Sequence, residues 1–158
     1  MPRHWAKDFL QLATSIGLNA EVLNRVNGWE ETVTIAGLRY FARSVTYNSE
    51  THEYFVGVDP KKVSDTNSAA LICGGVQDCL ADVLIVPWTE FIAVLAAGEP
   101  VRTRKEGGYM QYKVHVRKTR DRWTMAAQRS GRGPGLDVSK WRYTPDEAVE
   151  LLGHPRNS

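Results

Sequence analysis

The chain has 158 residues, of which 42% are hydrophobic and 24% are charged. These proportions are those of an ordinary globular protein, and the length predicts one domain that spans residues 1–158. No apolar run approaches the roughly 20 residues that a membrane-spanning helix needs, and the N-terminus lacks the hydrophobic stretch of a signal peptide. These features argue against a membrane protein, and we expect a cytoplasmic one.

The charge is divided unevenly along the chain. In total, 20 Lys and Arg residues stand against 18 Asp and Glu residues, for a net charge of +2. Residues 99–142 hold twelve of the basic residues and four of the acidic ones, so this segment carries +8 and the rest of the chain carries −6. Such a concentration favours a surface that meets a polyanion, and nucleic acid is the commonest one, because phosphate contacts release bound counterions. The basic segment 99–142 is therefore the first candidate for a functional surface.

Apolar spacing predicts two helices near the N-terminus. Apolar residues recur at helical intervals from Trp5 to Ile16, and Gly17 ends this first helix. A second short helix is predicted over residues 20–26, with Asn19 as its cap. The pair would form a helix-turn-helix with residues 20–26 as the recognition helix, which is a minor hypothesis because that segment lies in the acidic part of the chain.

The rest of the chain alternates between strand patterns and helices. A central helix is predicted over residues 90–97, and Thr144-Pro145-Asp146-Glu147 is typical of a capping box that begins a C-terminal helix. The predicted strands are 32–35, 39–45, 54–58, 69–73, 81–86, 109–116 and 123–126, and Gly74-Gly75 and Gln77-Asp78 are expected to separate the fourth from the fifth. Most connections are too short for parallel crossovers. The predicted fold is therefore α+β, with a mainly antiparallel or mixed sheet of about six strands, N-terminal helices, one central helix and a C-terminal helix.

The basic segment contains a predicted hairpin with cations on one face. Lys113, His115 and Arg117 alternate along one strand, so they share a face while Val114 and Val116 point to the core. Arginine and lysine on such a strand can contact phosphates or base edges. The other candidate nucleic-acid contacts in and around the hairpin are Arg102, Arg104, Lys105, Lys118, Arg120, Arg122, Arg129 and Arg132.

Aromatic residues are interleaved with these cations. Tyr109, Tyr112, Trp123 and Trp141 are candidates to stack on an unpaired or flipped base. The alternative is a solvated basic strand whose aromatic side chains point into the core.

A metal-dependent nuclease is an alternative function. Asp59-Pro60-Lys61 has the D-x-K spacing of many restriction nucleases, and Glu53 is a second carboxylate that could join Asp59 in holding Mg²⁺ beside Lys61. Against this hypothesis, Pro60 bends the segment. We expect no other metal or cofactor, because the two cysteines, Cys73 and Cys79, lack a zinc-site spacing.

Several segments together resemble a known class of protein. They are Tyr54-Phe55-Val56-Gly57-Val58, Leu71-Ile72-Cys73-Gly74-Gly75, Leu84-Ile85-Val86-Pro87-Trp88 and Tyr112-Lys113-Val114-His115-Val116. Their succession is similar to DNA-recognition modules of bacterial restriction and modification-sensing proteins, some of which have a restriction-endonuclease-like core. The resemblance implies DNA recognition over roughly residues 40–140, without implying catalysis, because a clean acidic pair followed by E-x-K or D-x-K on a regular strand is missing.

The leading hypothesis is a domain that binds nucleic acid, with duplex DNA as the expected partner, in a bacterial defence or restriction context. A separate catalytic domain or subunit would be a natural partner. The alternatives are the Mg²⁺-dependent nuclease and a protein-interaction domain whose basic face binds an acidic partner.

Overall fold

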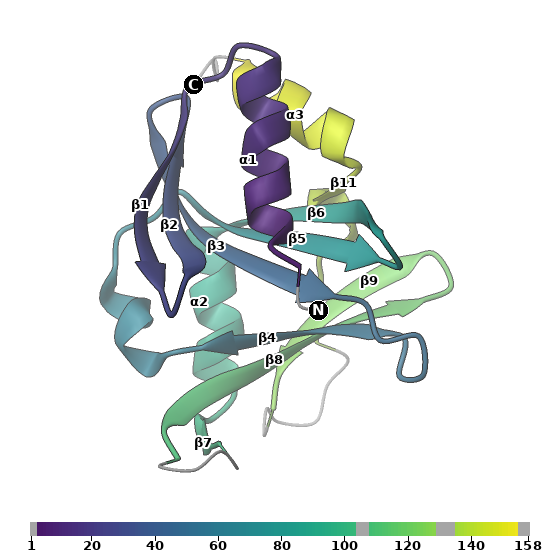
Figure 1. Ribbon diagram of the computed structural model, residues 1–158. Coiled ribbons are helices and arrows are strands. Elements are labelled where there is room, and N and C mark those ends of the chain that lie inside the picture. The colour runs from purple at the N-terminus through teal and green to yellow at the C-terminus, as the bar shows by residue number, and fades with distance from the viewer. Residues whose placement is uncertain (1–2, 104–107, 129–134, 155–158) are drawn as a thin grey trace.

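The computed structural model describes residues 3–103, 108–128 and 135–154 (Figure 1). Over these residues the chain forms the α+β fold predicted from the sequence, with three α-helices and eleven strands. The helices are α1 (Trp5–Ser15), α2 (Trp88–Ala97) and α3 (Pro145–Gly153), with two short 3-10 helices, η1 (Pro60–Ser64) and η2 (Ser139–Trp141). The strands are β1 (Ala20–Val26), β2 (Trp29–Ile35), β3 (Leu38–Thr46), β4 (Glu53–Val58), β5 (Ala69–Val76), β6 (Cys79–Pro87), β7 (Val101–Arg102), β8 (Met110–Thr119), β9 (Arg122–Ala127), β10 (Leu136–Asp137) and β11 (Arg142–Tyr143).

The strands form two sheets, where the sequence predicted one. Sheet A has the order β1-β2-β3-β5-β6-β11, and sheet B has the order β10-β9-β8-β4, with β7 paired to β8. All pairs are antiparallel except β3 and β5, which run parallel. The parallel pair arises because the intervening strand β4 leaves sheet A and joins sheet B. This excursion places β4 directly beside the basic β8–β9 hairpin.

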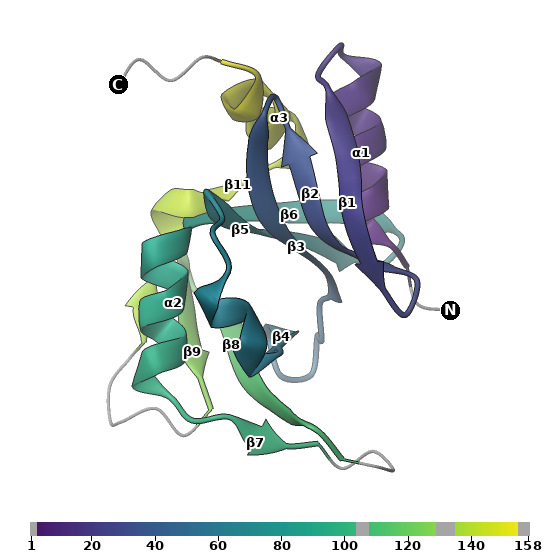
Figure 2. The ribbon, with the colours of Figure 1, turned by 90° about the vertical axis from the view of Figure 1, so that its left-hand side faces the viewer.

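The central strands β5 and β6 of sheet A are buried on both faces over most of their length, whereas the edge strand β1 is largely exposed. Helices α1 and α3 cover one face, and their core includes Phe9 and Val149 around Leu71 of β5. Sheet B and α2 pack against the other face, in a core that includes Tyr54 and Phe91. Figures 1 and 2 show this layering, with α1 and α3 on one side of β5 and β6 and the β8–β9 hairpin on the other. Sheet B is therefore an outer layer whose inner face packs against sheet A and α2.

Buried polar contacts connect the two sheets. The hydroxyl of Tyr54 on β4 donates a hydrogen bond of 2.6 Å to Oδ2 of Asp82 on β6, and Arg142 Nε on β11 donates one of 2.7 Å to Oδ1 of the same carboxylate. Nearer the other end of β4, Arg43 of β3 donates from Nε to the carbonyl of Gly57 at 3.0 Å. Because buried polar groups that are satisfied hold a unique geometry, these contacts set the position of β4 against sheet A.

The C-terminal helix begins as the sequence predicts. The Thr144 side chain accepts from the Glu147 backbone, the Glu147 side chain accepts from the Thr144 backbone, and Pro145 is the first helical residue. The predicted strands 32–35, 39–45 and 54–58 fall within β2, β3 and β4, and the predicted helix 90–97 falls within α2. Within the described part of the chain, no helix is both long and apolar enough to cross a membrane.

The predicted second helix is wrong, because residues 20–26 form strand β1. β1 pairs with β2 in an antiparallel hairpin, with Ala20 opposite Ile35 and Val26 opposite Trp29. The local helical signal is only seven residues long, and the strand pairing outweighs it. The helix-turn-helix hypothesis is therefore also wrong, because its recognition helix does not exist.

The two central glycines lie inside a strand and do not separate two strands. Gly74 and Gly75 belong to β5, and the turn to β6 comes at Gln77-Asp78, as predicted for that pair of residues. A Cβ atom at Gly74 would collide with the ring of Tyr54, and one at Gly75 would collide with the ring of Trp5. Each glycine therefore leaves space for an aromatic ring that packs against sheet A. In the sequence, a glycine with this packing role cannot be distinguished from a glycine in a turn.

Candidate functional site

The outer face of sheet B carries the basic strand that the sequence singled out. Residues of β8 alternate strictly, with Val114 and Val116 fully buried and Lys113, His115 and Arg117 on the opposite side. In the register with β4, Arg117 is opposite Glu53, His115 is opposite Phe55 and Lys113 is opposite Gly57. We refer to the following residues as the outer face: Glu53, Phe55, Gly57, Lys113, His115, Arg117, Thr124 and Ala126.

Glu53 organises two of the basic residues on the outer face. Arg117 donates from Nε to Glu53 Oε2 at 3.0 Å, and Nδ1 of His115 lies 3.1 Å from the same oxygen. Burial alone would raise the pKa of Glu53, but the hydrogen bond from Arg117 and the positive charges beside it hold that pKa below its ordinary value. Glu53 is therefore ionised at neutral pH and keeps Arg117 in a defined position.

Phe55 occupies the middle of this charged surface. Its side chain is 44% exposed, whereas its neighbours Tyr54 and Val56 are fully buried. The ring meets the imidazole of His115 edge-on, at 5.7 Å between centroids. Phe55 is absent from the site residues predicted from the sequence, because it lies in a continuous apolar run whose composition does not show which side chains face water. The signal was present only in the strand period: if Tyr54 and Val56 point inward, Phe55 must point outward.

The tip of the hairpin adds further positive charge. β8 and β9 extend to Thr119 and Arg122, so the turn is only Arg120-Asp121, with Arg120 in the left-handed region at φ 56°. Lys118, Arg120 and Arg122 are all exposed. The hairpin over residues 110–127 contains five Lys and Arg residues and one Asp, for a net charge of +4.

The remaining predicted basic contacts are only partly placed. Arg102 lies on β7, is exposed, and donates to the carbonyl of Gly108 at 2.9 Å. Arg104, Lys105, Arg129 and Arg132 lie outside the described residues.

The predicted stacking residues differ in their surroundings. Trp123 is buried, and its ring stacks on Tyr54 at 5.8 Å, so it serves the core and not a ligand. Tyr112 and Trp141 are half-buried and pack against the same core. Tyr109, by contrast, is 54% exposed just before β8.

The structure does not bring the predicted nuclease residues together. Glu53 and Asp59 lie at opposite ends of β4, about 20 Å apart at a rise of about 3.3 Å per residue. Asp59 caps η1 by accepting from the backbone of Lys61 at 2.9 Å. Within the described residues, no three His, Cys, Asp or Glu side chains gather to hold a metal ion.

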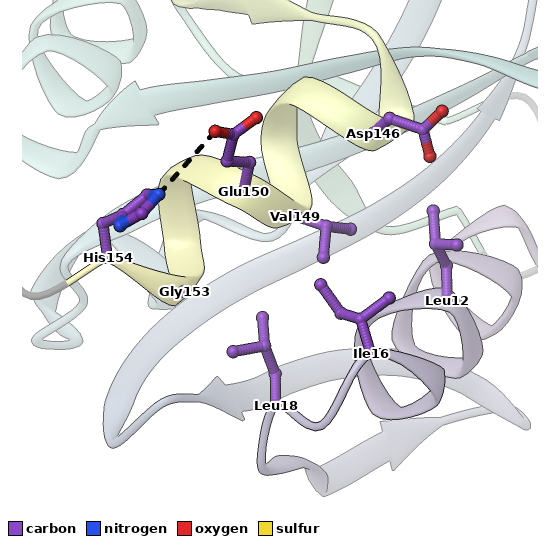
Figure 3. A pocket seen from close by; sticks show the side chains of 8 residues that line it. All are labelled: Leu12, Ile16, Leu18, Asp146, Val149, Glu150, Gly153 and His154. Atoms are coloured by element: carbon purple, nitrogen blue, oxygen red, sulfur yellow. Dashed lines mark ion pairs between the residues drawn. The ribbon is translucent and has the colours of Figure 1, made fainter.

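A groove lies between α1 and α3, away from the outer face. It has a volume of about 380 Å³, and its apolar floor includes Leu12, Ile16, Leu18 and Val149 (Figure 3). Its charged residues, Asp146, Glu150 and His154, are exposed at the rim, where His154 Nε2 lies 3.8 Å from Glu150 Oε1. The groove therefore has an apolar floor and exposed charged residues at its rim, and none of these charged residues is buried. It lies on the opposite side of sheet A from the outer face.

In comparisons with protein-family models, curated proteins and solved structures, none matches this chain. The resemblance to DNA-recognition modules therefore stays an expectation, and function is inferred from the residues of the outer face.

Proposed function

We propose that this chain binds nucleic acid through the outer face of sheet B and the tip of its hairpin. The observation that carries the proposal is the alternation of β8, which puts Lys113, His115 and Arg117 on one solvent-facing side with no apolar layer over them in the described residues. A row of cations on a rigid strand neutralises phosphates at little entropic cost, since the backbone is already ordered.

The charge of the basic segment is concentrated where a polyanion can reach it. Arg142 belongs to the same segment, but it is paired with Asp82 in the interior and its charge serves the fold. Lys118, Arg120 and Arg122 are exposed at the hairpin tip and have only Asp121 as an acidic neighbour in the turn. The tip and the outer face together therefore form a positive surface on one layer of the protein.

The broader setting follows from the sequence. The resemblance to restriction and modification-sensing modules favours DNA, with a duplex as the expected form and a separate catalytic partner. The cytoplasmic location is expected from the sequence and does not depend on the resemblance. An acidic protein is the competing ligand for the same surface. No contact among the described residues favours the Mg²⁺-dependent nuclease.

The proposal is tested by reversing charge at two sites and measuring fluorescence anisotropy with labelled DNA. The test variant is Lys113→Glu with Arg117→Glu. The matched control is Lys7→Glu with Arg25→Glu, two exposed residues on α1 and β1 that change the net charge by the same amount on another part of the surface. Titrations at about 50 mM and about 200 mM salt give the salt slope.

We expect the test variant to lose binding to every sequence and to lower the salt slope by roughly one per removed contact, while the control keeps the parent slope. Equal losses in both variants would show that only net charge matters and would overturn the placement. If the parent binds no nucleic acid even at low salt, the proposal is wrong and the acidic protein partner takes its place.

A further inference from the structure

We infer that the nucleic acid meets the outer face as an unpaired strand, with a base stacked on Phe55. This inference rests on the proposed function, but it replaces the duplex that the resemblance favours with a single strand. Phe55 is one of the most exposed aromatic side chains in the described residues, at 44%, and it lies in the centre of the charged face. The Phe55 ring belongs to neither hydrophobic core cluster, because its neighbours Tyr54 and Val56 supply the buried contacts of β4 and its ring contact is with His115 on the same face.

The chemistry of a phenyl ring selects an unpaired base. Phenylalanine has no donor or acceptor, so it cannot recognise the polar edges that a duplex presents in its grooves. It offers only a flat apolar face, and in a duplex the faces of the bases are already covered by their neighbours. In a single strand the bases are free to stack on aromatic side chains, which is how sheet surfaces bind unpaired nucleic acid.

The residues on either side of Phe55 suit the edge of a stacked base. Glu53 precedes it by two positions on the same face. Arg117 Nε and His115 Nδ1 both contact its Oε2, so Oε1 accepts no hydrogen bond from the described residues. On the other side, the Gln111 amide lies over Gly57, where a Cβ atom would come within 2.6 Å of Gln111 Oε1. A carboxylate and an amide thus flank the ring, and both groups form hydrogen bonds with base edges.

The neighbouring strand supplies the contacts for the sugar-phosphate backbone. Arg117, His115 and Lys113 stand opposite Glu53, Phe55 and Gly57 in the β4–β8 register. The two rows lie about 4.8 Å apart, as paired strands do. A single strand laid along the outer face would therefore place its bases over β4 and its phosphates over β8.

The test compares Phe55→Ala and Phe55→Tyr with the parent protein. The matched control is Leu23→Ala, which removes an exposed apolar side chain from β1, on sheet A. Each protein is titrated by fluorescence anisotropy with a mixed-sequence DNA strand of about 20 nucleotides, with the RNA of the same sequence, and with the DNA annealed to its complement. Site sizes of roughly this length or less are usual for such surfaces.

We expect the parent to bind a single strand more tightly than the duplex, and Phe55→Ala to weaken single-strand binding roughly 5- to 150-fold, the range expected for one lost stack. Phe55→Tyr and Leu23→Ala should bind like the parent, and duplex binding should change little in any variant. The DNA and RNA arms then show which strand is preferred.

The inference is overturned if Phe55→Ala binds single strands as the parent does, or if the parent prefers the duplex. In either case the charge reversal at Lys113 and Arg117 still reports on the proposed function, so the two failures are distinguishable. If the parent binds neither single strands nor duplex, both the proposed function and this inference are wrong.

Discussion

Removing the carboxylate of Asp82 should destabilise the protein far more than removing an exposed one. Asp82 is 5% exposed and accepts hydrogen bonds from Tyr54 at 2.6 Å and from Arg142 at 2.7 Å. These contacts join β4 of sheet B to β6 and β11 of sheet A. In Asp82→Ala the buried hydroxyl of Tyr54 loses its acceptor, and Arg142 loses its counter-charge.

The size of the effect follows from these two losses. Breaking a buried ion pair costs about 3–5 kcal/mol, and an orphaned buried hydroxyl costs about 1–3 kcal/mol. The losses overlap, and the Arg142 side chain is 32% exposed, so water replaces part of its lost contact. We therefore expect a loss of about 3–4 kcal/mol in the free energy of unfolding. At about 2–4 °C per kcal/mol for a chain of this size, Tm should fall by about 6–16 °C.

The measurement is thermal unfolding followed by circular dichroism, supported by urea titration. Asp78→Ala is the control, because Asp78 is an exposed carboxylate in the β5–β6 turn, close to Asp82 along the chain. Tyr54→Phe should cost less than Asp82→Ala, since Arg142 still pairs with Asp82. The reasoning is refuted if Asp82→Ala melts within about 2 °C of the parent, which is under about 1 kcal/mol.

Two further predictions concern single titratable groups. The pKa of Glu53 is held below its ordinary 4.5 by Arg117 and the charge beside it, so its contribution to stability is present above about pH 4.5 and is lost as the pH falls through the folded-state value. In acid titrations of unfolding, the stability gap between the parent and Glu53→Gln should therefore shrink below pH 4.5, and a gap that is constant with pH would contradict this. Burial raises the pKa of Cys73, whereas Cys79 is exposed. A chromogenic disulfide reagent should modify one thiol per folded chain and the second only after denaturation, whereas two fast thiols would contradict the burial of Cys73.

Local signals were sufficient for much of the secondary structure. The capping box at Thr144 and Glu147, the alternation along β8 and the helical stripe that begins at Trp5 each depend on neighbours a few residues away. The alternation of β8 also predicted correctly that Val114 and Val116 are buried and that Lys113 and Arg117 share the opposite side. Successive side chains of any strand point to opposite faces, so this alternation holds for every pairing partner of the strand.

These local signals did not predict which strands pair. Residues 20–26 have a helical pattern, but they form β1 because β2 is available as a partner. Gly74 and Gly75 have the composition of a turn, but they lie within β5 because Tyr54 and Trp5 occupy the space over them. The rings that pack over the glycines lie 20 and 70 positions away in the sequence, and β1 pairs with residues up to 15 positions away.

The same division applies to the candidate site. The basic strand, and the residues that share a side of it, can be predicted from the alternating pattern. The pattern does not show that β4 lies beside this strand, that Glu53 holds Arg117 at 3.0 Å, that Trp123 is buried or that Phe55 is exposed. These features depend on which elements pack against a strand, and that packing is set by contacts between distant segments. β4 pairs with β8 because it joins sheet B instead of sheet A. No spacing of residues in the sequence predicts this choice of sheet.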